Sequence, residues 1–427
     1  MVGRLRIQRL ATAAVAAWLG LSLALAGCGS ARNQHQAKLA APATTAATAP
    51  GAGAGTGTGT PAAVAPPTML VWVSRGLPAR FAARVGALPG VRRVVAVVSG
   101  TVWMTRSASA SGRTVDRPPA GMAIPLELAG ADPAALAPFV PAVSGNLRAS
   151  LEGGRAVLGA TSARLRRLGA GGTLELTPAP GTGGAERRVS VAGMVPDAAT
   201  GAHELLVSRT TAAALGQTTE RYLLVAPAAG TAWQTVAARI RALLPASALP
   251  LLRIRGPGQA RYLRQADAVL APVEEKALFG EFAANPQPRA GGWLTIDPRW
   301  VAAHITTASV PLLGPVTCNR AILPQLRGAL AEVQRRGLGG LVHVNDFAGC
   351  YAARLIPGDP GPSIAHHAWG SAIDINARAN PLGQHPTQDR RLVAIFERWG
   401  FAWGGDFLVP DGMHFELLHQ TPQAPAG

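Results

Sequence analysis

Two short segments near the carboxyl end of the chain contain the residue types of a catalytic metal site. The first is His367-Ala-Trp-Gly-Ser-Ala-Ile-Asp374, and the second is Asp411-Gly-Met-His414-Phe-Glu416. The side chains of His367, Asp374 and His414 can fill three positions of a tetrahedral zinc ion and leave the fourth for water. Asp411, three residues before the last ligand, can then accept a proton from that water. The two segments together predict hydrolysis at one Zn²⁺ ion.

The alternation of side chains along a strand supports this arrangement. In a strand over 371–375, Ile373 and Ile375 share one face, and Asp374 points to the opposite face. In the second segment, His414 and Glu416 share a face in the same way. A carboxylate and an imidazole that stand opposite buried apolar residues can project into a common cleft.

Each fragment taken singly also fits a purely structural role. The adjacent His366 and His367 could form a surface pair, and His366 competes with His367 as a ligand. Pro410-Asp411-Gly412 is an ordinary turn sequence, in which aspartate favours local hydrogen bonds.

Read together, four segments resemble the VanY-type D-alanyl-D-alanine carboxypeptidases. These are zinc peptidases whose fold is shared with hedgehog signalling domains, and phage L-alanyl-D-glutamate endopeptidases belong with them. The resemblance covers about residues 290–420 and is specific in its motifs and in their order. The segments that carry it are 349–354, 367–376, 401–406 and 411–416.

The resemblance implies a role for each residue of the site. It implies zinc on His367, Asp374 and His414, and its ligand spacing selects His367 over its neighbour. Asp411 would be the general base that takes a proton from water and later gives it to the leaving amine. Arg354, which can bind two oxygens at once, would steady the developing oxyanion or a peptide carboxylate.

Two further residues are expected to orient the ligands, and one position departs from the family pattern. Glu416 and Asn376 are candidates for hydrogen bonds that fix the ligating side chains. Ala365 stands two residues before the first ligand, where many relatives have serine, and Ser363 is displaced by two. This departure puts a polar substrate contact in doubt and leaves the metal unaffected.

Three functions are compatible with these residues. The first is a zinc peptidase that trims peptidoglycan stem peptides, most simply a carboxypeptidase that releases terminal D-alanine. The second is an endopeptidase of the same chemistry that cuts between L-alanine and D-glutamate. The third is a wall-binding or signalling module that keeps the metal without turnover. Asp411 and Arg354 argue against the third, because a binding module needs no base beside a water-bearing metal.

The amino-terminal segment predicts export and a lipid anchor. Three arginines precede an apolar stretch over residues 10–26, which ends in Leu25-Ala-Gly-Cys28 and resembles a bacterial lipobox. The alternatives are a transmembrane anchor and an ordinary signal peptide. We expect residues 1–27 to be a lipoprotein signal peptide, Cys28 to carry the lipid, and the protein to face the cell wall from the membrane.

Residues 28–66 consist mainly of Ala, Thr, Gly and Pro and lack the apolar side chains needed for a core. We expect a disordered tether, whose reach is about 35 Å as a flexible coil and about 120 Å when stretched.

The net charge of +17 is unevenly distributed. Residues 290–427 contain ten arginines and ten acidic residues, so the whole excess lies in residues 1–289. A basic amino-terminal half should be attracted to an anionic membrane and wall, although arginines also serve simply to solvate a surface. Nucleic acid is not an expected partner, since export is predicted and basic residues are not interleaved with aromatic ones.

Cysteine usage agrees with an oxidising compartment. Apart from Cys28, the chain contains only Cys318 and Cys350. An even pair in an exported protein predicts a disulfide, with two separate buried thiols as the alternative.

The remaining elements predict an α+β protein. Residues 67–258 are expected to form an α/β region that begins with a strand over 69–73, a helix over 78–88 and strands over 91–98 and 101–105, as in ferredoxin-like modules. This block loosely resembles extracytoplasmic domains of bacterial ABC-type permeases. It contains no cluster of ligand residues, and its lone His203 is expected to be structural. We expect it to be a spacer, to dock an envelope protein or to have a regulatory role.

Residues 259–427 are expected to form the zinc peptidase domain, with the hedgehog/DD-peptidase fold. Helices are predicted over 259–270, with a possible continuation to 279, and over 321–336 and 390–399. Strands are predicted over 341–344, 372–375 and 413–418.

Overall fold

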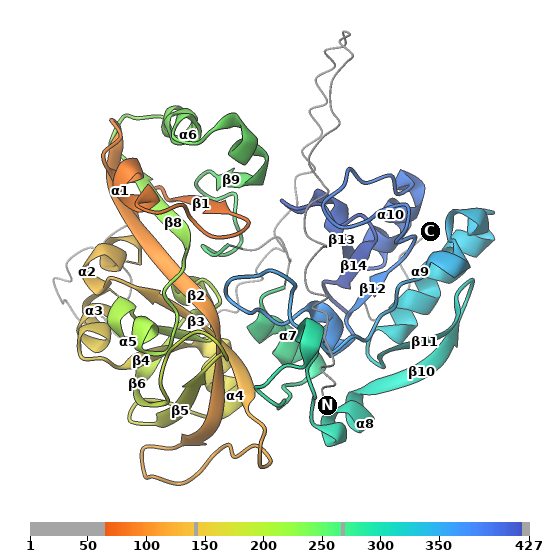
Figure 1. Cartoon of the computed structure of the whole chain (residues 1–427), viewed down its shortest axis with the longest axis horizontal. Helices are drawn as coiled ribbons and strands as arrows, with labels where there is room; N and C mark the ends of the chain where they lie inside the picture. The colour runs from red at the N-terminus through yellow and green to blue at the C-terminus, as the bar shows by residue number, and fades with distance from the viewer. Residues whose placement is uncertain (1–64, 141–143, 266–269, 421–427) are drawn as a thin grey trace, which may run out of the picture. The chain divides into compact units, whose positions relative to one another are not determined.

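The structure is a computed structural model that describes residues 65–140, 144–265 and 270–420 (Figure 1). The predicted signal peptide over 1–27, the lipid site Cys28 and nearly all of the tether lie outside these residues. Within the described ranges, no helix has the length and apolarity needed to cross a membrane. The described residues belong to one compact unit.

The amino-terminal part is built on a nine-stranded mixed sheet with the order β3-β7-β4-β6-β5-β2-β8-β1-β9. The pairs β3–β7 and β4–β6 are parallel and the other pairs are antiparallel. The strands are β1 (Met69–Val73), β2 (Val91–Ala108), β3 (Ile124–Ala131), β4 (Ala156–Gly159), β5 (Thr173–Pro178), β6 (Arg187–Val195), β7 (Leu205–Ser208), β8 (Glu220–Pro227) and β9 (Leu252–Arg255).

Short helices cover the sheet, and alternate residues of a strand pack into different apolar clusters on its two faces. In β1, Met69 and Val71 pack in one apolar cluster with α1 and α6, whereas Leu70 and Trp72 belong to a separate cluster. The helices are α1 (Phe81–Gly86), α2 (Pro133–Leu136), α3 (Ser144–Glu152), α4 (Ala160–Arg166), α5 (Arg209–Ala214) and α6 (Trp233–Ala242).

The prediction of two strands over 91–98 and 101–105 is wrong, because a single strand of 18 residues, β2, runs through both (Figure 1). Gly100 lies inside this strand, at a close approach to Gln217. A Cβ atom there would lie 2.1 Å from the side-chain oxygen of Gln217. The α+β class is confirmed. The expected ferredoxin-like start is part of a larger sheet, in which β1 pairs with β8 and β9.

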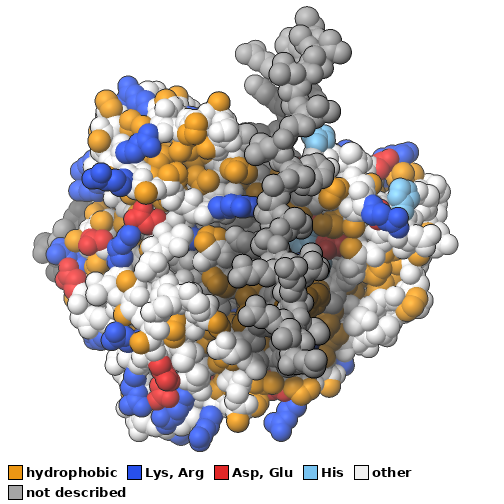
Figure 2. All heavy atoms as spheres, in the orientation of Figure 1, with side chains coloured by type: hydrophobic (Ala, Val, Ile, Leu, Met, Phe, Trp, Pro, Cys, Tyr) orange, Lys and Arg blue, Asp and Glu red, His pale blue; other side chains and the backbone are white. Residues whose placement is uncertain are grey.

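The basic residues of this part are spread over its surface. On the face shown in Figure 2, Lys and Arg side chains are scattered over the side that contains the nine-stranded sheet, with few acidic side chains among them. Several arginines of the amino-terminal part pair with acidic side chains, as Arg188 does with Glu175 at 2.6 Å. Surface arginines therefore supply solvation and local pairing as well as net charge.

His203 is a buried structural residue of this part. Its Nδ1 lies 2.9 Å from the carbonyl oxygen of Thr200, and its ring stacks on Tyr222 with centroids 6.1 Å apart. Burial lowers the pKa of His203 from 6.5 to about 4. The folded chain therefore holds this imidazole neutral at a pH where the unfolded chain would protonate it.

We expect His203 to make the folded chain acid-sensitive. Between pH 6.5 and about 4 the unfolded state binds a proton that the folded state does not, so stability falls as the pH falls. The loss amounts to about 3 kcal/mol over that interval. Urea unfolding of wild type and His203→Asn at several pH values checks this, because the variant should show a flatter slope. Identical slopes would contradict it.

The carboxyl-terminal part contains a three-stranded antiparallel sheet with the order β12-β14-β13 and a separate β10-β11 hairpin. The helices predicted over 321–336 and 390–399 are confirmed as α9 and α10. The elements are α7 (Pro272–Phe279), α8 (Pro298–His304), β10 (Ile305–Val310), β11 (Gly314–Asn319), α9 (Leu323–Arg335), β12 (Ala372–Asp374), α10 (Arg390–Arg398), β13 (Phe401–Trp403) and β14 (His414–Leu417).

Two predicted elements of this part are wrong. Residues 259–265 form bends, so the expected helix over 259–270 does not begin there, and within the described ranges its continuation is present as α7. Residues 341–344 join the two 3₁₀ turns Gly339–Leu341 and Val344–Asp346 and form no strand. Asn376 explains the second difference, because its side chain accepts from the backbone NH of His343 and donates to the carbonyl of Leu341. The side chain of Asn376 thus forms the backbone hydrogen bonds that a neighbouring strand would otherwise form.

Helix α7 is held to the amino-terminal sheet by a buried network of charges. The ammonium of Lys276 lies 2.9 Å from Glu204, and Arg166 lies 2.6 Å from Glu204 and 2.5 Å from Glu281. All four side chains are largely or fully buried, so each charge depends on its partners. Glu275, the residue before Lys276 on this helix, faces His366 in the carboxyl-terminal part.

Candidate metal centre

Three side chains from the predicted segments converge on one point. His367 comes from the 3₁₀ turn His366–Trp369, and Asp374 and His414 are directly opposite each other on β12 and β14. His367 Nε2 lies 3.1 Å from His414 Nδ1 and 3.2 Å from Asp374 Oδ1. His414 Nδ1 lies 3.1 Å from the same carboxylate oxygen. The three residues are buried, and their donor atoms form a nearly equilateral triangle.

The size of this triangle fits a zinc ion. With zinc–ligand bonds of 2.0–2.1 Å, the donor atoms of a tetrahedron lie about 3.3 Å apart. The observed separations of 3.1–3.2 Å are close to that value. Two imidazole nitrogens and one carboxylate are also donors that zinc prefers. These residues could therefore hold one Zn²⁺ ion.

The other nitrogen of each imidazole fixes the tautomer that a metal requires. His367 Nδ1 lies 2.8 Å from the carbonyl oxygen of Cys350, so this nitrogen donates and Nε2 is left with a lone pair. His414 Nε2 lies 3.4 Å from Glu416 Oε2, which leaves Nδ1 toward the centre. Glu416 thus lies where the sequence placed it, beside a ligand that it can orient.

Protons compete with a metal ion for the same atoms. Burial alone would raise the pKa of Asp374, but hydrogen bonds from His367 and His414 hold it below its ordinary value. Burial alone would lower the pKa of His414, but Asp374 and Glu416 raise it to about 10. The cation must displace a proton from this imidazole, so metal binding strengthens as the pH rises.

Asp411 lies beside the three ligands on the turn before β14. Burial raises the pKa of its carboxyl above the ordinary value, and the nearby charges of His414 and Arg354 oppose the rise. Its Oδ1 is buried and has no hydrogen-bond partner within the described ranges. The turn is held by Trp403, whose indole NH donates to the carbonyl of Gly412 at 2.8 Å. An unpaired carboxylate with raised basicity suits a general base.

Arg354 lies on the segment that runs next to the ligand turn. The backbone NH of Ala365 donates to its carbonyl at 3.1 Å, and its charge reaches the Asp411 carboxylate. Its side chain is half-buried, and its guanidinium forms no hydrogen bond or ion pair with any other described residue. Arg354 is therefore available to a substrate oxygen.

The side chain of Asn376 forms contacts other than the predicted hydrogen bonds to metal ligands. Besides its two bonds to the 341–343 backbone, its Nδ2 lies 2.8 Å from Gln388 Oε1. Among the described residues, none of its side-chain bonds reaches a metal-ligating residue. Asn376 shapes the loops behind β12 and does not orient the ligands directly.

Three residues that the sequence did not single out as ligand supports connect to the site through Glu416. His366 Nδ1 lies 2.8 Å from Glu416 Oε2 and 3.4 Å from Glu275 Oε1. The hydroxyl of Ser371 lies 2.8 Å from the other oxygen of Glu275 and 3.0 Å from the carbonyl of His366. His366 therefore lies beside a ligand-supporting residue and is not itself a ligand, and Glu275 on α7 in turn lies beside His366.

We expect Glu275→Gln to weaken zinc binding about tenfold, since residues that support ligands typically change metal affinity by that order. The amide keeps the shape of the side chain but replaces the carboxylate that faces His366. The matched control is Glu274→Gln on the same helix, whose carboxylate caps the helix at Ala271 and pairs with Arg261. Zinc affinity measured against a chelator checks this, and equal affinities for both variants would contradict it.

The two predicted disulfide cysteines are joined, with Cα atoms 5.3 Å apart. Cys350 lies between two ligands, because its carbonyl holds His367 and the preceding Gly349 pairs with Asp374. The disulfide links this segment to the end of β11 at Cys318. It therefore fixes the backbone from which one ligand is oriented.

Replacing both cysteines by serine should lower stability by about 3–4 kcal/mol, as expected for a loop of this length. It should also weaken zinc binding about tenfold, because the carbonyl that orients His367 loses its anchor. Thermal unfolding and chelator competition measure the two effects separately. Lost stability with unchanged zinc affinity would show that the disulfide does not act on the ligand.

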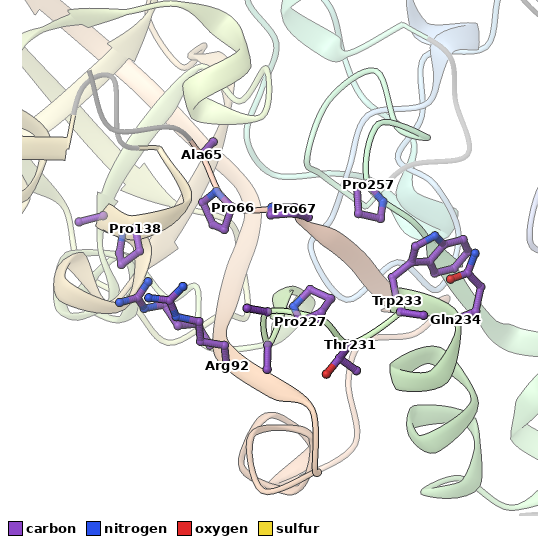
Figure 3. A pocket seen from close by; sticks show the side chains of 16 residues that line it. Ala65, Pro66, Pro67, Arg92, Pro138, Pro227, Thr231, Trp233, Gln234 and Pro257 are labelled. Atoms are coloured by element: carbon purple, nitrogen blue, oxygen red, sulfur yellow. The ribbon is translucent and has the colours of Figure 1, made fainter. Parts of the chain in front are cut away.

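A cavity of about 940 Å³ lies in the amino-terminal part, away from these residues (Figure 3). Proline, alanine and glycine form most of its wall, with Arg92, Arg93 and Trp233 as its larger side chains. No carboxylate, histidine or cysteine lines it, so it offers neither a metal site nor a catalytic base.

The family model of the D-alanyl-D-alanine carboxypeptidases matches residues 360–417. The match contains His367, Asp374, Asp411 and His414, whereas Arg354 lies before it. The carboxyl-terminal part therefore contains a VanY-type domain, and the match supports a peptidase of a family that acts on peptidoglycan. None of the curated proteins matches this chain.

Several solved structures are similar to the chain at low identity. The periplasmic region of MacB from Actinobacillus actinomycetemcomitans is 11% identical over 44% of this chain and 88% of its own, with a TM-score of 0.31. The extracellular domain of the noncanonic ABC-type transporter YknZ from Gram-positive bacteria is 10% identical over 44% and 99%, with a TM-score of 0.29. A permease domain from Porphyromonas gingivalis is 16% identical over 47% and 93%, with a TM-score of 0.28.

Proposed function

We propose that this protein is a zinc peptidase that hydrolyses peptidoglycan stem peptides, most simply as a D-alanyl-D-alanine carboxypeptidase. The main support is the triangle of donor atoms with edges of 3.1–3.2 Å, beside a buried carboxylate oxygen of Asp411 that has no partner in the described part of the chain. This arrangement lies in the segment that the family model matches.

When bound at His367, Asp374 and His414, zinc supplies a Lewis acid that polarises a carbonyl and makes a water molecule acidic near neutral pH. Asp411 accepts the proton of that water and returns it to the amine that leaves. Arg354 binds a peptide carboxylate or the developing oxyanion. Glu416 holds His414 in one orientation while the charge at the site changes.

A binding module that keeps zinc without turnover is the less favoured alternative. Such a module gains nothing from a buried carboxylate with no partner, because burying it costs free energy that a binding protein would not need to spend. The position of Asp411 is therefore an argument for catalysis.

We also propose that the chain is anchored by lipid at Cys28 and works in the cell wall. The support is the order of arginines, apolar residues and cysteine in the first 28 residues, followed by the tether. Cys28→Ala should move the protein from the membrane fraction to the soluble fraction. Continued membrane association of this variant would favour an uncleaved anchor.

The direct test of the activity is incubation of the zinc-loaded full chain with defined muropeptides, followed by mass measurement of the products. Loss of one terminal alanine identifies a carboxypeptidase, and a split stem identifies an endopeptidase. Unchanged masses at every metal loading would reject both.

A further inference from the structure

Arg354 belongs to a small ribbon whose register also places an aromatic residue beside it. Trp293 lies directly opposite Arg354 in an antiparallel bridge. The bridge is flanked by Leu294 NH donating to Ala353 at 2.8 Å and Leu355 NH donating to Gly292 at 2.9 Å. Bonds on both sides make this a non-hydrogen-bonded pair, the kind in which opposite side chains stand closest.

The alternation along both strands separates an inner and an outer face. Leu294 is buried, and Ala353 and Leu355 pack against the core of the carboxyl-terminal part. Trp293 and Arg354 must therefore share the outer face, and Ile356, two residues further on, belongs to it as well.

The two apolar residues of this outer face are exposed to an unusual degree. Trp293 is 43% exposed and Ile356 is 44% exposed, although most large apolar side chains of this part are buried. Large apolar side chains that flank a free arginine at the surface are typical of a binding site.

The indole is held in place by the turn that precedes it. Gly291 and Gly292 both have φ of +78°, a conformation that other residues rarely adopt. A Cβ atom on Gly291 would lie 3.4 Å from the indole of Trp293, so the ring rests against this turn. A preorganised ring loses little conformational entropy when a ligand covers it.

The register also gives the order of these residues relative to the metal ligands. Leu355 pairs with Ile364, so Ala365 lies opposite Arg354 on the side away from Trp293. Ala365 leads directly into the turn that contains His367. Since neighbouring strands lie about 4.8 Å apart, Trp293 is one strand further from the ligands than Arg354.

We propose that Trp293 and Ile356 form a subsite for an aliphatic side chain of the stem peptide, on the far side of Arg354 from the metal ligands. This inference rests on the proposed zinc peptidase activity and favours its endopeptidase form over the carboxypeptidase. An indole beside an isoleucine gains most from covering hydrocarbon. A peptide that ended at Arg354 would leave the subsite bare, so peptides that continue past this residue should bind more tightly, as an endopeptidase requires.

The test compares two stem peptides that share the residues up to the scissile bond and the residue after it. One ends there with a free carboxylate, and the other continues by one residue with an aliphatic side chain. Their binding to the zinc-loaded full chain carrying Asp411→Asn is measured by calorimetry, so that hydrolysis does not interfere. We expect the longer peptide to bind about tenfold more tightly, which corresponds to about 1.4 kcal/mol.

Adding Trp293→Ala should remove most of this preference, and Trp293→Phe should keep it. The matched control is Met194→Ala, which removes a 59% exposed side chain from the amino-terminal sheet and should change neither affinity. Equal affinities for the two peptides, a preference that survives Trp293→Ala, or no binding of either peptide would each overturn the proposal. Hydrolysis by the unmodified chain is scored separately, so failed turnover with the expected binding would reject the proposed function alone.

Discussion

His414→Ala should abolish stoichiometric zinc binding, with the affinity falling by more than about 100-fold. Residues that only support a ligand typically change metal affinity by 10–100-fold, so loss of a ligand itself should exceed that range. The variant also leaves the buried carboxylates of Asp374 and Glu416 without their shared imidazole partner. Metal content after dialysis against zinc, measured by elemental analysis, checks the expectation.

Two further variants separate a lost ligand from a lost fold. His414→Gln keeps a polar side chain in β14 and should also fail to retain zinc, while its far-ultraviolet dichroism matches wild type. His385→Ala removes an exposed histidine outside the site and should retain one equivalent of zinc. Retention of a full equivalent by a folded His414 variant would place the metal elsewhere.

The ligands could be predicted from the sequence because each depends on local structure. Alternation within β12 and β14 brings Asp374 and His414 to matching positions, and their pairing in the structure is direct. Helices α9 and α10 could also be predicted from the sequence, since their apolar residues recur at helical spacing. The roles of these residues still depend on the tests above.

The support of the site could not be predicted, because it comes from distant parts of the chain. Glu275 reads as an ordinary acidic residue in the first turn of a helix. It becomes part of the site only because α7 packs against the turn of His366. The same holds for the continuity of β2 at Gly100, because the side chain of the distant Gln217 occupies the space next to this residue.

Asp411→Asn should lower turnover by about 100- to 10,000-fold, the usual contribution of a general acid–base residue. The amide has nearly the shape of the carboxylate but cannot accept the proton of the attacking water. Zinc content and unfolding temperature should remain those of wild type, because Asp411 is not a ligand. The effect should appear in kcat, with KM little changed, when muropeptide hydrolysis is followed by mass.

The pH dependence of turnover tests the role of Asp411 independently. Asp411 must be ionised to accept a proton, so wild-type activity should fall as the pH drops through the pKa of this carboxyl in the zinc-loaded enzyme. The residual activity of Asp411→Asn should lack this acidic limb of the pH–activity profile, provided that zinc remains bound over the pH range. Asp406→Asn, an exposed aspartate in the preceding turn, is the matched control and should keep both the rate and the limb.

The combination of these measurements distinguishes a base from a residue that only shapes the turn. Asp411 N donates to the carbonyl of Gly404, and its own carbonyl accepts from His414, so its backbone alone accounts for the turn. The side chain adds a buried oxygen that pairs with nothing in the described residues. If the variant kept wild-type turnover with the acidic limb intact, that oxygen would have no part in the reaction, and another group would have to accept the proton of the water.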